Sequence, residues 1–179
     1  MGKNITIRPA VEADTRAMVK VNVDTLKATY AHFYPPHLLA ARTYEAVEAS
    51  WRPRLWHSPT IEEYPFVAET EAGEIIGVLI CGPIADPDYQ AEIFTLFVLP
   101  DYHNQGIGKK LVQGAVTKLL ERNLTSMVVW VLKDNPAQYF YEAIGGEQVR
   151  EKVVERNNTK LIEIGHGWHR IETIPFTLS

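Results

Sequence analysis

EIFTLFVLPDYHNQGIGKK, residues 92–110, combines a strand, a loop and the start of a helix in one short segment. Apolar and β-branched residues dominate Glu92–Leu99 and Pro100 stops the pattern, so a strand is predicted there. A two-residue period sorts its side chains onto opposite faces, with Glu92, Phe94, Leu96 and Val98 on one and Ile93, Thr95 and Phe97 on the other.

Two glycines stand at the start of the predicted helix. After the loop Asp101–Gln105, apolar residues recur at helical spacing from Ile107 to Leu119. Gly106 and Gly108 let the backbone approach a ligand closely, and the unpaired N–H groups and dipole of a helix N-terminus favour an anion. The sequence therefore predicts a phosphate-binding loop at this point.

Two common phosphate-binding motifs do not fit this loop. A P-loop requires Gly, four residues, then Gly-Lys-Ser/Thr, but His103 stands five residues before Gly108 and Lys110 follows Lys109. The dinucleotide fingerprint requires a third glycine where Leu111 stands, and it lies early in a chain rather than past its midpoint. Neither a P-loop NTPase nor a Rossmann enzyme is expected.

Predicted strands and helices surround this segment on both sides. Further strands are expected at 5–8, 66–70, 74–81, 127–132, 149–155 and 161–164, and further helices at about 14–30, 43–55 and 136–144. The sequence shows no internal repeat and no sign of a second domain. Residues 1–179 are expected to form a single domain of the mixed α/β class.

Composition excludes several classes of protein. The formal net charge of -4 is small and the basic residues are scattered, so nucleic-acid binding is not expected. The lone Cys81, the absence of a signal-peptide pattern and the lack of a long apolar run indicate a cytoplasmic protein without a membrane span. His166 and His169 lack a third ligand nearby, so no metal site is assigned.

Three groups of residues resemble the GNAT superfamily of N-acetyltransferases. They are Val98-Leu99-Pro100 at the strand end, Gly106-Ile107-Gly108 in the loop, and Asn135 followed by Phe140-Tyr141-Glu142. The resemblance implies a GNAT-like fold, with a central mixed and splayed β-sheet of about 6–7 strands and helices on both faces. It also implies acetyl-CoA as the acyl donor.

The same resemblance implies which residues hold the donor. The pantetheine arm would pair with the strand backbone, the pyrophosphate would lie on loop N–H groups, and an amide would hold the pantetheine end. These residues are Leu96, Phe97, Val98, His103, Asn104, Gln105, Gly106, Ile107, Gly108, Lys109 and Asn135. His103 stands where relatives carry Gln or Arg, and Asn104 where Gly is frequent, so side-chain contact with the pyrophosphate is weakened or made by imidazole.

Amine acylation needs proton transfers that two residues are suited to provide. A lysine-like amine is neutral to only roughly one part in 2,500 at pH 7, so a base or a water relay is useful. The resemblance implies that Glu92 is this base, acting through water, and that Tyr141 protonates the departing thiolate as a phenol still protonated at pH 7. Both have structural alternatives: Glu92 as a solvated carboxylate and Tyr141 as a packed helix residue.

Other motif residues also have two interpretations. Asn135 before Pro136 is an N-cap whether or not it touches the cofactor. Lys109 and Lys110 either meet the 3′-phosphate or only solvate the helix. The aromatic segment 30–56 either lines the amine pocket or closes the core.

The resulting hypothesis is an N-acetyltransferase that transfers the acetyl group of acetyl-CoA directly to a primary amine of a small molecule or peptide, in a ternary complex. Two alternatives stay open. One is a non-catalytic acyl-CoA sensor, and the other is a transferase for a longer acyl group. A homodimer is also open, because many relatives of this family form one.

Overall fold

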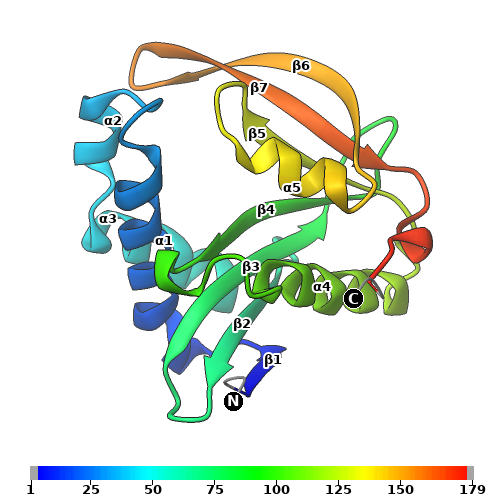
Figure 1. Ribbon diagram of the computed structural model, residues 1–179, viewed down its shortest axis with the longest axis horizontal. Coiled ribbons are helices and arrows are strands. Elements are labelled where there is room, and N and C mark those ends of the chain that lie inside the picture. The colour runs from blue at the N-terminus through cyan, green and yellow to red at the C-terminus, as the bar shows by residue number, and fades with distance from the viewer. Residues whose placement is uncertain (1–3, 177–179) are drawn as a thin grey trace.

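A seven-stranded mixed sheet forms the centre of the computed structural model, which describes residues 4–176 (Figure 1). The strand order is β1-β2-β3-β4-β5-β7-β6. The strands are β1 Ile5–Pro9, β2 Tyr64–Thr70, β3 Ile75–Pro83, β4 Ala91–Val98, β5 Met127–Leu132, β6 Glu147–Arg156 and β7 Thr159–Trp168. The α-helices are α1 Thr15–Tyr30, α2 Pro36–Ala41, α3 Tyr44–Arg52, α4 Ile107–Glu121 and α5 Ala137–Ala143. The expected splayed mixed sheet with helices on both faces is confirmed.

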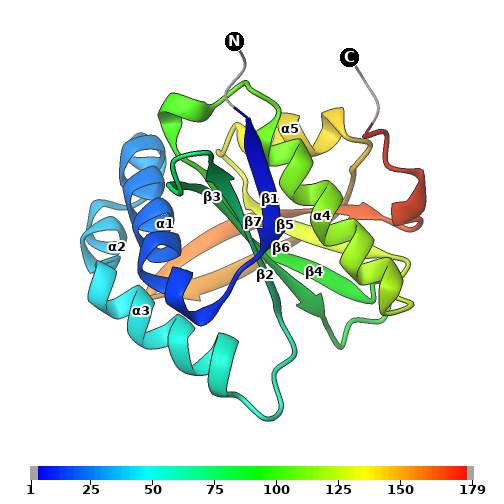
Figure 2. The same cartoon turned by 90° about the horizontal axis from the view of Figure 1, so that it is seen from below.

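Each face of the sheet has its own apolar core, and Figure 2 shows α1 and α3 on one side of it and α4 on the other. Met18 and Val21 of α1 and Val47 of α3 pack with Val67 and Val78 of the strands. On the opposite face, α4 and α5 pack against the sheet through a second cluster, which includes Leu111, Val112, Leu119, Tyr141, Ile76 and Leu79. The apolar stripes of α1 and α4 thus fix the sheet between two helical layers.

The connections explain why the central strands are arranged as they are. The first four strands form an antiparallel meander, whereas β4 and β5 are parallel neighbours. Parallel strands need a crossover connection, which α4 supplies. Because α4 therefore begins directly after β4, its N-terminus lies beside the end of that strand.

A β-bulge in β4 changes the predicted faces. Ile80 pairs with Thr95 and Cys81 with Ile93, so Phe94 is the extra residue. Ile93 and Leu96 then belong to the core under α4, while Phe94 and Phe97 pack toward α1. The strict alternation predicted from the sequence was wrong, because the bulge resets the period.

Glu92 shows the consequence for the site. Its neighbours Ala91 and Ile93 both face the α4 core, so its own side chain points to the α1 face. That is the face of Phe97, whereas the sequence pattern had placed the two on opposite faces.

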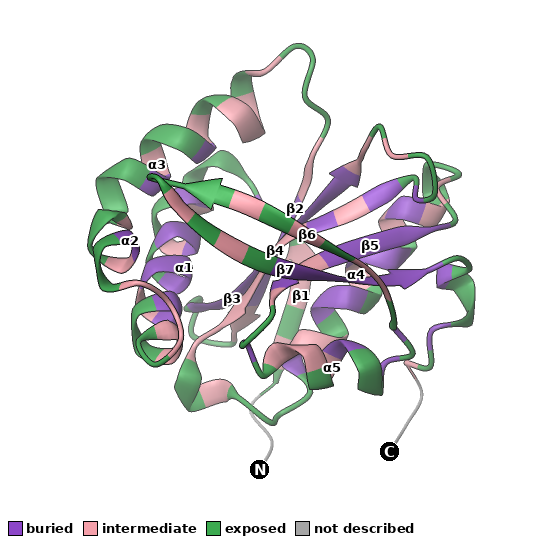
Figure 3. Cartoon of the chain, turned by 90° about the horizontal axis from the view of Figure 1, so that it is seen from above, coloured by how far each residue is buried: buried purple, intermediate pink, exposed green. Residues whose placement is uncertain are grey.

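The hairpin of β6 and β7 is longer than predicted and arches past β5 (Figure 1). Figure 3 shows it exposed toward its tip and buried where it pairs with β5. Near the tip, Nε2 of His37 lies 2.8 Å from Oγ1 of Thr159, which joins α2 to the hairpin. Helix α2 was not predicted, because its apolar run is only about one and a half turns long.

Two glycines explain why β7 continues beyond the predicted end. A Cβ on Gly167 would lie 2.2 Å from the Tyr89 hydroxyl, and one on Gly165 would lie 3.1 Å from the Trp130 ring. Glycines weaken the strand pattern in a sequence, so the strand was predicted to end before them. In the structure, the missing side chains leave room for the rings of Tyr89 and Trp130. His166 between them is fully buried within the strand rather than at its end.

None of the helices between residues 4 and 176 combines the length and apolar character that crossing a membrane requires.

Gly146 sets how closely α5 packs against β7. A Cβ there would lie 2.6 Å from the Trp168 ring and 2.9 Å from the Tyr141 carbonyl oxygen. Gly146→Ala is therefore expected to lower the free energy of unfolding by about 1–3 kcal/mol, measured by urea denaturation.

Gly114→Ala in α4 is the matched control for this substitution. Its Cβ would lie 3.3 Å from the Ile7 methyl group and 3.5 Å from the Phe66 ring, and alanine favours a helix interior. A change below about 1 kcal/mol is expected. Equal losses in the two variants would contradict the tight packing of α5.

Candidate active site

The parallel strands β4 and β5 separate after a short paired stretch, as Figure 1 shows. Their register pairs Ala91 with Met127, Glu92 with Val128, and Ile93 with Val129, and then ends. Beyond this point lies a cavity of about 380 Å³. Its walls are Leu26, Tyr30, Tyr34, Arg42, Ile93, Phe94, Thr95, Leu96, Phe97, Val129, Trp130, Val131, Leu132, Asn135, Ala137, Tyr141, Arg156 and Glu163.

One edge of β4 is left without a strand partner in this cavity. Leu96, Phe97 and Val98 pair with β3 on one side, but β5 has turned away on the other. Backbone N–H and C=O groups need partners wherever they are removed from water. An extended ligand that carries amide groups fits this edge, because it can pair with it as an added strand would.

The start of α4 has the form of an anion cradle. Gly106 adopts φ 75°, in the left-handed region, and open space surrounds the position where a Cβ would stand. Glycine is thus needed there for its backbone conformation. A Cβ on Gly108 would touch Phe140 of α5 at 3.4 Å, so the second glycine lets the two helices approach. The N–H groups of Ile107, Gly108 and Lys109 form the first turn, where helical partners are lacking.

The loop side chains before α4 stabilise the loop itself. Nε2 of His103 donates to the carbonyl oxygen of Val98 at 2.7 Å, and Nε2 of Gln105 donates to that of Asp101 at 3.1 Å. Asn104 has φ 59°, also left-handed, and is exposed. The cradle therefore consists of backbone N–H groups, and the imidazole is already occupied in fixing the strand end.

Tyr141 extends from α5 into the cavity lining and is 5% exposed. Its ring lies edge-on to Trp168, with centroids 6.3 Å apart, and its hydroxyl makes no hydrogen bond to any residue from 4 to 176. Burial raises the pKa of this phenol above its usual value. Tyr141 therefore keeps its proton at neutral pH and has it free to donate.

Glu92 lies beside the cavity rather than in its wall. It is half-buried on β4, and burial raises its pKa to about 7, with Lys152 acting in the opposite direction. Tyr141 belongs to the core under α4, whereas Glu92 points to the α1 face. The two predicted catalytic residues thus approach the opening between the strands from opposite faces of the sheet.

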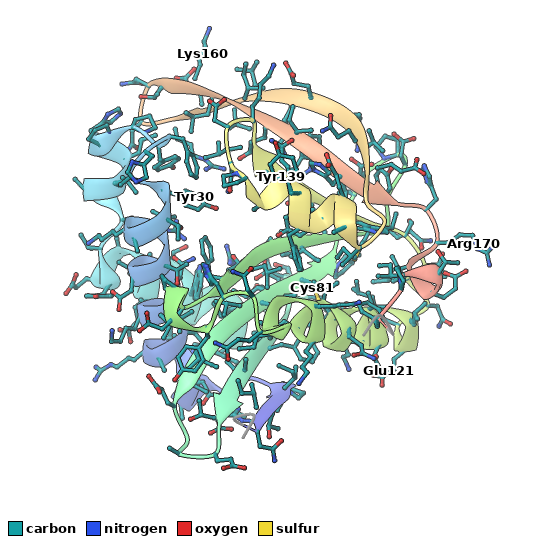
Figure 4. The ribbon with its side chains drawn as sticks, viewed as in Figure 1. Tyr30, Cys81, Glu121, Tyr139, Lys160 and Arg170 are labelled. Atoms are coloured by element: carbon teal, nitrogen blue, oxygen red, sulfur yellow. The ribbon has the colours of Figure 1, made fainter. Side chains whose placement is uncertain are left out.

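Asn135 has two side-chain partners. Its Oδ1 accepts from the N–H of Ala137 at 2.9 Å, which caps the first turn of α5 as the sequence predicted. Its Nδ2 donates to the hydroxyl of Tyr30 at 2.9 Å. Figure 4 shows Tyr30 projecting from α1 toward this part of the structure. The amide therefore joins the two sides of the cavity.

Three charged residues of the cavity wall were missed by sequence reasoning. They are Arg42, Arg156 and Glu163. Glu163 is buried and pairs with Arg156 at 2.6 Å and with Lys152 at 3.5 Å. A carboxylate within the apolar run Leu161–Ile164 was the available signal. Arg42 lies in segment 30–56, for which lining of the amine pocket was one of two interpretations, but that interpretation rested on the aromatic residues and not on this arginine.

A family model described as the acetyltransferase (GNAT) family matches residues 26–145. The chain belongs to the GNAT family of acetyltransferases. The resemblance drawn from the sequence is thereby confirmed, as is the enzyme class of N-acetyltransferase.

Two relatives illustrate the range of this GNAT chain. YuaI of Bacillus subtilis, an uncharacterised N-acetyltransferase, is 30% identical over 177 residues, 98% of this chain and 99% of the relative. A ribosomal protein bS18 alanine N-acetyltransferase of Haemophilus influenzae is 32% identical over 88 residues, which is 49% of this chain and 58% of that protein. The first therefore compares whole chains and the second only parts.

Solved structures share the GNAT fold. A GCN5-related N-acetyltransferase of Rhodopseudomonas palustris gives a TM-score of 0.72 at 22% identity, covering 93% of this chain and 97% of that one. The PaiA N-acetyltransferase of Thermoplasma acidophilum, in complex with coenzyme A, gives 0.69 at 20% identity, covering 90% and 98%.

Within residues 4–176 of this GNAT protein, no group of three or more His, Cys, Asp or Glu side chains is placed to hold a metal ion.

The raised pKa of Glu92 implies a cost to stability at high pH. Because its folded pKa of about 7 exceeds the ordinary value of 4.5 for a glutamate, stability present below pH 4.5 is lost as pH rises through 7. Glu92→Gln removes this loss, so its stability relative to wild type should rise by about 3 kcal/mol between pH 4.5 and pH 8.

Urea denaturation at the two pH values measures this difference. Glu155→Gln, at an exposed position of β6, is the control and should follow wild type. A Glu92→Gln curve that also follows wild type at both pH values would show that Glu92 is well solvated.

Proposed function

We propose that this GNAT enzyme transfers the acetyl group of acetyl-CoA directly to a primary amine of a small molecule or peptide, in a ternary complex. The observation that carries the proposal is the cavity between β4 and β5, with an unpaired strand edge on one side and the Tyr141 hydroxyl in its wall. The coenzyme A in the Thermoplasma structure supports the same ligand type here.

The cavity and the start of α4 fit this donor in two places. The edge of β4 at Leu96–Val98 has no partner strand and suits the amide groups of pantetheine, with the Val98 carbonyl oxygen already accepting from His103 and Thr25. The first turn of α4 suits the pyrophosphate. Asn135 would give up its hydrogen bond to Tyr30 or share it when it meets the pantetheine end. The side chains of His103 and Gln105 would hold the loop rather than touch the phosphates.

Transfer then needs a neutral amine. Glu92, with a pKa of about 7, can accept the amine proton near neutral pH, where a general base is most effective. Because Glu92 is outside the cavity wall, the proton would pass through water. The amine nitrogen then forms a bond to the acyl carbon, and the carbon–sulfur bond breaks to release the thiolate.

Tyr141 would act on the sulfur. Its hydroxyl is free to donate, and the departing thiolate is the group that gains charge. Full proton transfer from a phenol of raised pKa to a thiolate is uphill, so its main contribution is a hydrogen bond that strengthens as charge develops. The thiolate is protonated in the same step or after release.

The test of this function is acetyl-CoA-dependent thiol release with a panel of amines, run on wild type and Tyr141→Phe. The variant removes a hydroxyl that has no hydrogen bond among residues 4–176, so folding and acetyl-CoA affinity should be unchanged. A loss of kcat of about tenfold or more is expected, as for removal of one transition-state hydrogen bond.

Tyr139→Phe is the matched control on the same helix, because Tyr139 is 74% exposed and should not matter. Wild type that binds acetyl-CoA without acylating any amine would favour the sensor alternative. Faster turnover with a longer acyl-CoA would favour the longer-chain alternative.

The pH dependence of kcat/KM tests Glu92 separately. Activity of wild type should rise through an apparent pKa of about 7 and then level off, because the base works deprotonated. Glu92→Gln should lower the plateau about tenfold or more and remove this limb. A limb that persists in the variant would assign it to another group.

Three broader expectations belong to the same proposal. Residues 1–179 would form one domain, since both cores share one sheet. The protein would act in the cytoplasm, where the buried, free Cys81 stays reduced. A homodimer would be consistent with this role but is not needed for the site.

A further inference from the structure

The positive and negative charges of the side chains in the cavity wall do not sum to zero. Arg42, Arg156 and Glu163 are the charged side chains that line it. Glu163 and Arg156 pair at 2.6 Å, and Lys152 adds a second cation to the same carboxylate at 3.5 Å. This leaves Arg42 as the charge in the wall that has no counter-ion from the wall itself.

Arg42 is fixed by a neutral partner. Its Nε and Nη2 donate to Oδ1 of Asn22 at 3.2 and 2.9 Å, and Asn22 is fully buried on α1. No carboxylate between residues 4 and 176 forms an ion pair with Arg42. Burial lowers the pKa of its guanidinium, which still stays charged near neutral pH.

The free edge of the guanidinium suits a specific ligand group. Asn22 occupies the Nε side, so the end formed by Nη1 and Nη2 remains available toward the cavity. That end presents two parallel N–H donors, which match the two oxygens of a carboxylate. A half-buried charge with only an amide partner costs free energy that an anionic ligand would offset.

We propose that the acceptor is an amine that also carries a carboxylate, and that Arg42 binds this carboxylate. The inference rests on the proposed acetyl transfer and deepens it. Arg42 and Asn22 belong to the α1 and α2 side of the cavity, which is the face toward which Glu92 points. An amino acid or a short peptide with its carboxylate near the amine has the required pair of groups.

Cavity size and charge both disfavour a polyamine. The cavity of about 380 Å³ lies near the lower end of small-molecule pockets, roughly 300–1,000 Å³, and it must also admit the thioester. A second ammonium group of the acceptor would meet Arg42 and Arg156, while Glu163 is already paired with two cations.

The carboxylate has one other source, which is the acyl group of a dicarboxylic donor such as succinyl-CoA. Donor and acceptor sources are separated by comparing acetyl-CoA with succinyl-CoA, and amino acids with their carboxamides. A carboxamide retains the amine and loses the charge. Its amine is also more often neutral, because the carboxylate raises the pKa of a nearby ammonium.

The experiment measures kcat/KM by thiol release for the common L-amino acids, their carboxamides, short peptides and spermidine. Wild type should prefer the best amino acid over its carboxamide by about tenfold or more. Arg42→Met should lower kcat/KM for that amino acid roughly 10- to 100-fold, as expected for a hydrogen bond to a charged group. The carboxamide should change by less than about threefold.

Two variants control for indirect effects. Arg42→Lys keeps the charge and should recover part of the amino-acid activity. Arg52→Met removes an arginine that pairs with Glu12 and Glu48 away from the cavity, and should match wild type. Calorimetric titration with acetyl-CoA should give the same affinity for all four proteins.

The outcomes separate the inference from the proposed function. Arg42-independent turnover of carboxylate-free amines, spermidine included, would overturn the inference and leave acetyl transfer intact. Arg42-dependent turnover of such amines with succinyl-CoA alone would also overturn it, because the carboxylate would then belong to the donor. Thiol release with none of the amines would count against acetyl transfer itself.

Discussion

The short pairing between β4 and β5 is the constraint on which the rest of the site depends. Parallel strands usually continue side by side, but here the ladder stops at Ile93 and Val129. The bulge at Phe94 bends β4 at this point and redirects its side chains. The separation exposes backbone polar groups that a ligand can pair with, and it opens a passage between the two faces of the sheet. Without it, the strands would form a closed core.

This passage places different chemistry on each face. The α4 face supplies an apolar surrounding for Tyr141, and the α1 face supplies Glu92 and the charged wall that includes Arg42. Burial acts on both titratable groups in the same direction, raising the pKa of the carboxyl and of the phenol. In the proposed mechanism the carboxyl group serves as a base near neutral pH, and the phenol retains its proton as a hydrogen-bond donor. The sheet separates the two groups.

The sequence predicted most of the framework because its signals there are local. The apolar and β-branched residues of Met127–Leu132 are enough to predict a strand. The glycines at 106 and 108 likewise predict the start of α4 without information about long-range contacts. The bulge at Phe94 was not predictable, since it depends on how β3 pairs with β4. Arg42 belongs to the wall only because α2 folds onto α1, and that contact joins segments with no shared pattern.

The candidate site shows the same division between local and long-range information. Tyr141 and Asn135 were recognised from a motif on one helix, and the cavity contains both. Glu163 and Arg156 reach the cavity through the β6–β7 hairpin, whose length was underestimated because glycines interrupt its strand pattern. His103 shows the converse, since a residue at a motif position bonds to Val98 instead of facing outward.

The hydrogen bond between Asn135 and Tyr30 has a thermodynamic consequence. It joins α5, on the donor side, to α1, on the acceptor side, across the opening between the strands. A ligand that competes for the Asn135 amide also changes the freedom of the Tyr30 ring, which packs on Phe97 with centroids 5.9 Å apart. In the proposed ternary complex the affinities of the two substrates are linked, and each alters the other by the same factor. One side-chain contact thereby couples the two binding sites without fixing the order in which the substrates bind.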